Sequence, residues 1–399
     1  MRKNCKVILS KLFIIIAFFV VGCIYADDKP KSDTESCDKK TSSDCKENSC
    51  KNNKPDETLQ IFKTNLKNTV EKFVRLRVKN KDNFSCIVCI NGEVIYKNNF
   101  APDELICMGS ITKQFTAYLL FQYLLKHNSS NWHDVIKLPI AQVPDLKEWC
   151  SSVMKDGECD WMSYVTIEDL LSHKSGMLKM ETFKTKVLGL MLKNLCSPIK
   201  HNDMLKYFIC DKNLKDTETF LYSDVNYIVL TLIVEKLYRK SYPDLIKDLA
   251  DRDGLSSLKN MPDLTISKII KTVPGMHQFK RTKYFPIKFC YGTGSLCANI
   301  IDINKWCLNK SEDVIYKILA KPRSYSKDVY YGYGLYMNYD ASAFWHPGRY
   351  YRFCSARTFT IYYKQCGVAV TLSVDGDEYF KDLCDIVDNV YLGIRNNRS

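Results

Sequence analysis

Two strand-rich stretches lie near opposite ends of this 399-residue chain. The first, SCIVCINGEVIYKNN (Ser85 to Asn99), reads as two β-rich runs joined by Asn91-Gly92, a pair that tolerates the positive φ angles of a type I′ hairpin turn. The second, RFCSARTFTIYYKQCGVAVTLSVDGD (Arg352 to Asp377), predicts two more strands with a turn near Gln365 to Gly367. Strands so far apart, with helical patterns between them, imply one sheet assembled from distant segments.

Helical periodicity fills most of the remaining chain. It predicts an opening amphipathic helix from Leu59 to Lys79, a last helix from about Tyr379 to Ile394, and helices with polar loops from His127 to about Lys283. Tyr227 to Leu237, YIVLTLIVEKL, is the most hydrophobic of these segments and should be buried. A chain of this length exceeds the size of one ordinary core. We therefore expect an α+β fold: an antiparallel sheet flanked by helices, plus a mostly helical lobe from about residue 126 to residue 284.

The N-terminus predicts export. A basic start is followed by an apolar stretch from Leu12 to Ala26, which is shorter than the roughly 20 residues of a spanning helix, so residues 1–26 read as a signal peptide. Cleavage could follow Ala26 or precede Cys23, because VVGC resembles a bacterial lipobox, and an uncleaved anchor is the third alternative. Residues 27–57 mix both charge signs with almost no large apolar side chain, which predicts a tether before a folded domain at 58–399.

Cysteine content and charge narrow the class of protein. Eighteen cysteines suit an oxidising compartment, and Cys150 and Cys159 are the best candidates for a local disulfide. Cys86 and Cys89 lack a second Cys or His pair, so we expect strand residues rather than zinc ligands, and no metal or cofactor. The net charge of +13 is spread along the chain, which indicates a mildly basic surface near anionic envelope polymers or lipid and not a nucleic-acid partner.

Ser110 and Lys113 stand at the head of an apolar helical run, MGSITKQFTAYLL. The same spacing recurs at Ser152/Lys155 and Ser256/Lys259, so the pattern alone does not separate a nucleophile from a helix N-cap with a solvated lysine. On a helix the two side chains share one face, and the helix N-terminus favours negative charge at the serine oxygen. Because the helix must be largely buried, the lysine needs a partner or a cavity.

Two further stretches supply groups for chemistry. FLYSDVNY places Tyr222 and Asp224 just before the most hydrophobic helix, and a phenol near a lysine can have a lowered pKa and accept a proton. FWHPGRYYRF places His346 and Gly348 at the start of a strand, where glycine allows a ligand to approach and the next N–H, that of Arg349, can bind an oxyanion.

Taken in order, these three motifs resemble the serine β-lactamase and penicillin-binding-protein superfamily, nearest its class C and esterase/D-peptidase branch. Tyr164 to Met177, YVTIEDLLSHKSGM, and the later YGTGSLCANIIDINKW and YYGYGLYM are similar to connecting segments of that family. The resemblance implies that Ser110 is the acylated nucleophile, Lys113 its proton-relay partner and Tyr222 the general base and acid. It also implies that Asp224, His346 and Gly348 bind substrate, with the Ser110 and Arg349 N–H groups as the oxyanion hole. His173 is structural in the resembling segment.

Two departures from the family pattern keep alternatives open. Asp224 replaces an asparagine and should hold Lys113 charged, and the bulky RYYRF from Arg349 to Phe353 should crowd the strand edge. An active serine hydrolase would cleave an ester, a D-amino-acid peptide such as a peptidoglycan stem, or, less favourably, a lactam. The alternatives are a non-catalytic relative that binds cell-wall peptide or a protein, and a secreted structural or adhesive protein in which the motifs occur by chance.

Export predicts a processed N-terminus. Mass spectrometry of the mature N-terminus should find either lipid on Cys23 or a free Asp27, because the apolar segment before them is a signal for processing. An intact Met1 on a protein that does not associate with membranes would contradict it.

Overall fold

The structure is a computed structural model that describes residues 55–79, 84–98, 104–154, 159–179, 205, 219–261, 291–310, 313–326, 329–338, 340–349, 356–364, 366–375, 379, 382, 385–387, 389 and 390. The chain divides into two units, Met1–Asp56 and Glu57–Ser399, and the fold below is that of the second. The proposed signal peptide and nearly all of the proposed tether lie outside the described residues. Among the described helices, none is both long and apolar enough to cross a membrane.

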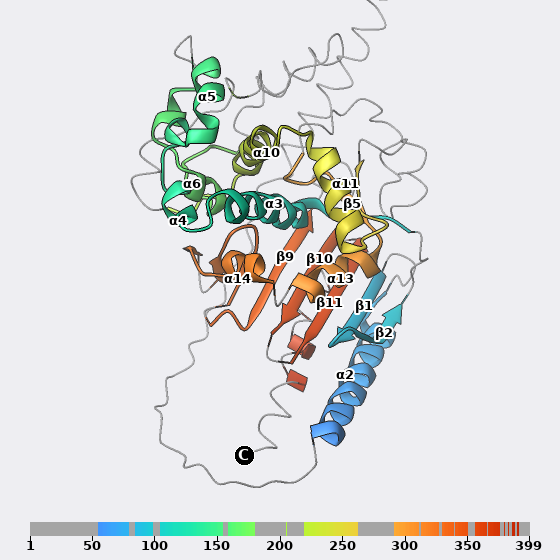
Figure 1. Cartoon of the computed structure of the whole chain (residues 1–399). Helices are drawn as coiled ribbons and strands as arrows, with labels where there is room; N and C mark the ends of the chain where they lie inside the picture. The colour runs from blue at the N-terminus through green and yellow to red at the C-terminus, as the bar shows by residue number, and fades with distance from the viewer. Residues whose placement is uncertain are drawn as a thin grey trace, which may run out of the picture. The chain divides into compact units, whose positions relative to one another are not determined.

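One antiparallel sheet forms the centre of the second unit, with the strand order β2-β1-β11-β10-β9-β8-β7-β6 (Figure 1). Its strands are β1 (Phe84–Ile90), β2 (Glu93–Asn98), β6 (Ser324–Ser326), β7 (Val329–Tyr331), β8 (Tyr336–Met337), β9 (Ala343–Arg349), β10 (Ala356–Tyr363) and β11 (Val368–Asp375). Ile87 pairs with Thr371, so the two strand-rich ends of the sequence are neighbours in one sheet, as predicted. A second small sheet has the order β3-β5-β4, from β3 (Ile106–Cys107), β5 (Leu296–Ala298) and β4 (Lys259–Asn260).

The turns of the two outer hairpins follow the sequence signals. Asn91 and Gly92 have φ angles of 49° and 85°, which fit the predicted turn between β1 and β2. Gly367 has a φ of 63° before β11, and its carbonyl accepts a hydrogen bond from the Asn91 N–H at 2.9 Å. The two turns therefore lie side by side at one end of the sheet.

Helices surround this sheet and form the other lobe. They are α2 (Pro55–Arg77), α3 (Thr112–His127), α4 (Trp132–Val135), α5 (Lys147–Val153), α6 (Ile167–Leu171), α10 (Asp224–Tyr238), α11 (Tyr242–Asp253), α13 (Ile300–Lys310) and α14 (Val314–Leu319), with 3₁₀ turns η2 (Gly109–Ile111), η3 (Ile140–Gln142), η4 (Pro144–Leu146) and η5 (Asp160–Ser163). The expected mostly helical lobe is confirmed over its described residues. The described residues at 382, 385–387, 389 and 390 are helical, within the predicted last helix.

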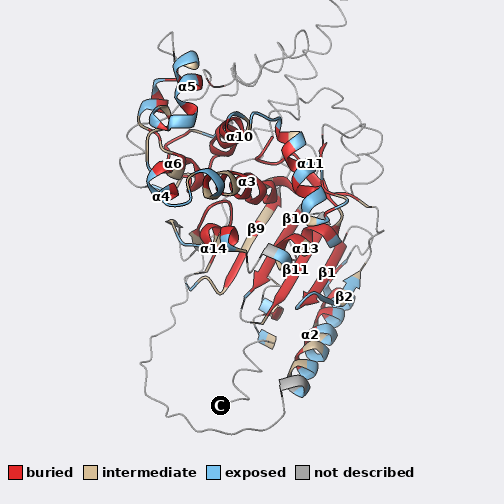
Figure 2. Ribbon diagram, viewed as in Figure 1, coloured by how far each residue is buried: buried red, intermediate tan, exposed pale blue. Residues whose placement is uncertain are grey.

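Two apolar clusters cover the two faces of the sheet. Cys86, Val88 and Ile90 of β1 pack with α2, whereas Ile87 and Cys89 face the larger cluster of the helical side. Successive strand residues point to opposite faces, so both faces of β1 are buried, and Figure 2 shows this strand in the colour of buried residues. Cys86 and Cys89 are thus strand residues, as expected.

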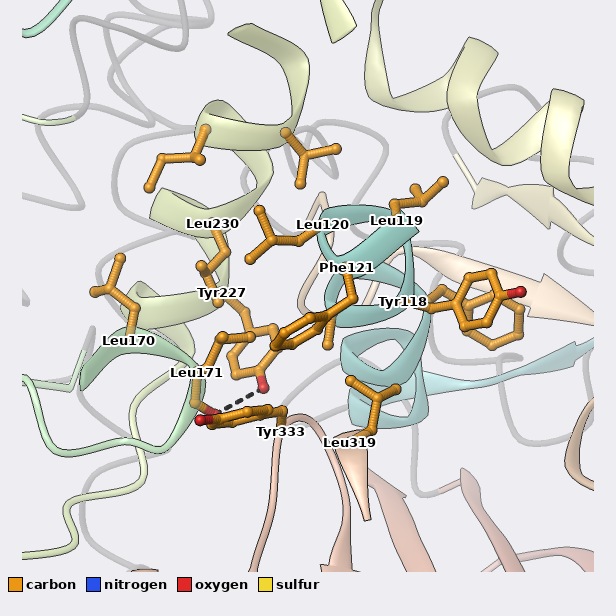
Figure 3. Close-up of a cluster of buried hydrophobic side chains, with 14 of the residues drawn as sticks. Tyr118, Leu119, Leu120, Phe121, Leu170, Leu171, Tyr227, Leu230, Leu319 and Tyr333 are labelled. Atoms are coloured by element: carbon orange, nitrogen blue, oxygen red, sulfur yellow. Dashed lines mark hydrogen bonds between the residues drawn. The ribbon is translucent and has the colours of Figure 1, made fainter. Parts of the chain in front are cut away.

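Helix α3 lies inside the larger cluster and carries the predicted serine and lysine segment to it. Figure 3 shows Leu120 and Phe121 of α3 beside Tyr227 of α10 and Leu171 of α6, and the Tyr227 hydroxyl donates to the Leu171 carbonyl at 2.9 Å. The ring of Phe121 stacks on Tyr333 with 5.3 Å between centroids. Contacts on all sides of α3 fix its N-terminal end relative to α10.

The predicted disulfide between Cys150 and Cys159 is wrong for this structure. Cys150 is a buried free thiol whose Sγ–H donates to the Ile140 carbonyl at 3.6 Å. Burial raises the pKa of this thiol to about 12, which makes it unreactive.

Two leucines on α2 test the packing of this helix on the sheet. Leu66 is fully buried and Leu76 is 64% exposed. Replacing Leu66 by alanine should lower the free energy of unfolding by about 2–5 kcal/mol, because it leaves a cavity in the core. The matched change Leu76→Ala should cost less than about 0.5 kcal/mol. Denaturant titration measures both values, and equal losses would contradict the packing.

Candidate active site

Ser110 lies in the η2 turn immediately before α3, and Lys113 lies in the first turn of α3. The helix starts after Ile111 without a capping side chain, so the alternative of a simple N-cap serine is wrong. Lys113 has no exposed surface, and its Nζ donates to Ser110 Oγ at 2.9 Å. The serine is therefore held against a buried lysine.

All three hydrogens of the Lys113 ammonium have acceptors. Besides Ser110, Nζ donates to Asp224 Oδ1 at 2.7 Å and to the Thr293 carbonyl at 3.1 Å. An ammonium has three donors and no acceptor, so this set of partners matches its charged form. A buried charge with these bonds is compensated, whereas the same charge without them would be costly.

Asp224 is the first residue of α10, after the N-cap residue Ser223. Its Oδ1 also accepts a hydrogen bond from the Thr293 hydroxyl at 2.8 Å. Burial works to raise the pKa of this carboxyl, but the Lys113 charge and the hydrogen bonds outweigh it and hold the pKa below its usual value. The Asp224–Lys113 pair is therefore ionised, as expected from the departure from asparagine.

Tyr222 completes the group around the serine. Lys113 Nζ lies 4.9 Å from the centre of its ring, and its hydroxyl is within hydrogen-bonding reach of Ser110. Burial and the Asp224 charge raise the pKa of Tyr222 well above 10, although the bond to Ser110 acts in the other direction. The expectation of a lowered pKa is therefore wrong, because these effects outweigh the nearby ammonium. Tyr222 is a neutral phenol at neutral pH.

His173 holds the segment that carries Tyr222 and Asp224. Its Nδ1 accepts from the Ser223 N–H at 3.2 Å and lies 2.9 Å from Asn226 Nδ2, while Nε2 lies 3.3 Å from the Tyr331 hydroxyl. Burial, and then the Lys113 charge, lower the pKa of His173 well below its usual value, so it stays neutral. These bonds hold the turn before α10 in place, which agrees with the structural role expected for His173.

Strand β9 runs past the serine segment. A Cβ on residue 348 would clash with the Met108 carbonyl oxygen, so only glycine allows the strand to approach η2 this closely. Thr358, paired with Gly348, donates to the Cys107 carbonyl at 2.6 Å and fixes the same contact. Arg349 ends β9 beside this contact, and its side chain and the remainder of RYYRF lie outside the described residues.

His346 sits on the same strand, with its ring centre 6.2 Å from that of Tyr222. Burial, followed by the Lys113 charge, lowers the pKa of His346 to about 3. Its Nδ1 lies 2.8 Å from the Pro347 carbonyl oxygen, which can only accept, so the proton of this neutral ring is on Nδ1. His346 therefore contributes a neutral ring to the site.

Thr293 is the site residue that sequence reasoning missed. The segment 291–296 binds the polar face of α3 at three points: Lys113 donates to the Thr293 carbonyl, Thr116 Oγ1 donates to the Gly292 carbonyl at 2.7 Å, and Thr112 Oγ1 accepts from the Leu296 N–H. A signal was present, since this segment lies in YGTGSLCANIIDINKW, which resembles a family segment. The three motifs by themselves give no residue of this segment a role.

The structure thus brings Ser110, Lys113, Tyr222 and Asp224 into direct contact, with β9 alongside. A buried ammonium holds the serine oxygen, and a phenol lies within reach of the same oxygen. This arrangement fits covalent catalysis by a serine, since a nucleophile and a proton-transfer group share one hydrogen-bonded network. Among the described residues there is no group of three or more His, Cys, Asp or Glu side chains that could hold a metal ion.

Comparison with known proteins agrees with this geometry. The family model described as Beta-lactamase matches residues 84–385. Unguisins hydrolase ungD' of Aspergillus campestris (strain IBT 28561) is 26% identical over 231 residues, which cover 54% of this chain and 40% of that protein. The match therefore spans less than half the length of that relative.

Solved structures with the same fold include several hydrolases. D-amino acid amidase from Ochrobactrum anthropi SV3, in complex with L-phenylalanine amide, gives a TM-score of 0.59 at 18% identity, covering 85% of this chain and 100% of that chain. A class C beta lactamase gives a TM-score of 0.59 at 11% identity, covering 85% of this chain and 99% of that chain. D-stereospecific amidohydrolase from Streptomyces sp. gives a TM-score of 0.57 at 14% identity, covering 79% of this chain and 94% of that chain. These likenesses show the fold.

Gly348 tests the contact between β9 and the serine segment. Gly348→Ala should lower the free energy of unfolding by about 1–3 kcal/mol and slow acylation of Ser110, because the added methyl group pushes the strand away from Met108. Gly294→Ala is the matched control, since its Cβ would meet its nearest neighbour, the Gly109 carbonyl carbon, at an ordinary 3.7 Å. Denaturant titration and labelling rates measure both effects. A Gly348→Ala protein as stable and reactive as Gly294→Ala would contradict the close approach.

Proposed function

The chain belongs to the beta-lactamase family, and we propose that it is an active serine hydrolase that cleaves an ester or amide through an acyl-enzyme on Ser110. The observation that carries the proposal is the fully buried Lys113 ammonium, which donates to Ser110 Oγ at 2.9 Å while Asp224 holds its charge. Family membership contradicts the alternative in which the motifs occur by chance.

Acylation requires that the Ser110 proton leaves as Oγ attacks the substrate carbonyl. Lys113 is charged and all of its donors are occupied, so it positions the serine and stabilises negative charge rather than accepting the proton. Tyr222 is the acceptor, and its reactive form is the phenolate beside the Lys113 ammonium. The phenol formed in this step then gives the proton to the departing amine or alkoxide. In deacylation Tyr222 takes a proton from the water that attacks the ester on Ser110. Tyr222 then gives this proton to Ser110 Oγ as the acyl–oxygen bond breaks, which releases the acid and restores the free serine.

The developing oxyanion needs fixed donors on the other side of the carbonyl. We assign this role to the backbone N–H groups of Ser110 and Arg349, because the glycine at 348 lets β9 approach the serine segment. Asp224 and the β9 edge from His346 to Gly348 then lie where the acyl part of the substrate binds. Thr293 acts through Asp224 and Lys113 as a positioning residue.

The proposed substrate class is an ester or an amide of a D-amino acid, such as a peptidoglycan stem peptide, in preference to a lactam. Two structural neighbours support it by their names, a D-amino acid amidase and a D-stereospecific amidohydrolase. Asp224 also supports it, since its carboxylate repels the carboxylate of a penicillin. We further propose that the enzyme acts after export, released or held at a membrane through the processed N-terminus.

A non-catalytic protein that binds such a peptide is the second candidate. The raised pKa of Tyr222 favours it, because only a small fraction of this phenol is ionised at neutral pH. The two candidates differ in whether Ser110 can be acylated.

Labelling with a fluorophosphonate tests the proposed function. The probe should modify Ser110, and Ser110→Ala should abolish labelling. Tyr222→Phe should slow labelling by a factor on the order of 100, as loss of a positioned proton acceptor does. Because the folded pKa of Tyr222 is raised, its reactive phenolate becomes more populated as pH rises, so the wild-type rate should increase from pH 7 towards pH 10. Tyr222→Phe should lack this increase, and aryl esters should react faster than penicillins.

Remote residues of the same types serve as controls. Ser151→Ala on α5 and Tyr123→Phe on α3 change exposed hydroxyls away from the site and should leave labelling unchanged. If the folded wild-type protein resists every acylating probe and still binds a D-amino-acid peptide, the non-catalytic candidate replaces the enzyme.

A further inference from the structure

The two charged groups beside Ser110 differ in their exposure to solvent. The side chain of Lys113 is 0% exposed, whereas that of Asp224 is 47% exposed. An ion pair with both members buried would present no net charge to an incoming molecule. Here the cation lies behind its partner, so the ionised surface that a substrate meets at this pair is the carboxylate.

The hydrogen bonds of the pair also leave only the carboxylate available to a substrate. Lys113 donates its three hydrogens to Ser110, Asp224 Oδ1 and the Thr293 carbonyl, so no donor remains for a substrate anion. On Asp224, Oδ1 accepts both the Lys113 and the Thr293 bonds. Within the described part of the chain no group donates to Oδ2, which leaves this oxygen for a donor from the substrate.

Strand β9, which carries His346, also offers an acceptor rather than a cation. His346 is neutral, and its Nδ1–H donates to the Pro347 carbonyl. Its Nε2 is then an acceptor, and this buried atom has no hydrogen-bond partner among the described residues. A buried acceptor without a partner is costly, which indicates that a donor completes it when the site is occupied.

We propose that the acyl part of the substrate carries a cationic amino group close to the cleaved carbonyl, and that Asp224 Oδ2 binds this group with His346 Nε2 as an additional acceptor. This inference rests on the proposed function and narrows its substrate class to aminoacyl esters and amides with a free ammonium group. The same acceptors disfavour an acyl group with a carboxylate at that position, because like charges repel across a partly desolvated site.

Three nearly isosteric p-nitroanilides test the preference: D-alanyl, with an ammonium group, isobutyryl, which is neutral, and methylmalonyl, with a carboxylate. The leaving group is the same, so ratios of kcat/KM report the acyl group. We expect the D-alanyl compound to exceed the isobutyryl compound tenfold or more, with the methylmalonyl compound slowest. Added salt should bring the D-alanyl/isobutyryl and isobutyryl/methylmalonyl ratios of kcat/KM closer to one, because Asp224 is half exposed and its interactions are screened.

Asp224→Asn is the informative variant, and the ratio rather than the absolute rate is its readout, since Asp224 also contacts Lys113. Its kcat/KM ratios should fall to within about twofold of one. Asp248→Asn, which removes an exposed carboxylate on α11, is the matched control and should keep the wild-type ratios. Wild-type ratios near one, or a preference for the carboxylate compound, would overturn the proposal.

Binding separates this inference from the proposed function. In the Ser110→Ala protein, calorimetry should give a Kd for D-alaninamide at least tenfold below that for isobutyramide, and Asp224→Asn in this background should remove the difference. If no probe acylates the wild-type protein but this binding preference persists, the hydrolase proposal fails and the ammonium site stands. If Ser110 is acylated but neither rates nor binding depend on the amino group, the ammonium site fails and the hydrolase stands.

Discussion

The buried ammonium of Lys113 is the interaction on which the site depends. Its three acceptors come from parts of the chain that are far apart: the η2 turn, the first residue of α10 and the segment 291–296. Removing a charge from water is costly unless its partners are in place, so displacing any one of these segments would destabilise the buried ammonium. One side chain therefore links the serine, the carboxylate and a loop that the sequence separates widely.

The rest of the fold supplies what this arrangement needs. Residues 112–121 of helix α3 are all buried, which fixes the direction of Lys113, and the close approach of β9 at Gly348 places a strand edge beside the serine. His173 fixes the turn before α10 through the Ser223 N–H and Asn226. The sheet that carries β9 is closed on both faces by apolar clusters, so the strand edge has a rigid support.

The electrostatics of the site follow from which groups are buried. Lys113 lies behind Asp224, so the pair is neutral as a whole but presents a carboxylate outwards. The same pair keeps Tyr222 and His346 neutral, in opposite ways: the carboxylate adds to burial in raising the pKa of Tyr222, and the ammonium adds to burial in lowering that of His346. The proposed chemistry and the proposed preference for an ammonium group both derive from this one charge distribution.

The sequence by itself determined the elements and most of the candidate residues. Asn91-Gly92 predicted its hairpin because few residues tolerate positive φ, the spacing of apolar residues predicted α2 and α10, and the order of three motifs selected Ser110 among several serines with a lysine three residues on. Tertiary structure alone decided how these residues act. The role of Thr293, the neutral state of Tyr222, the free thiol of Cys150 and the unequal exposure of Lys113 and Asp224 depend on distances and burial between segments remote in sequence. Local patterns carry no information on these quantities, because burial and charge compensation are set by neighbours that only folding brings together.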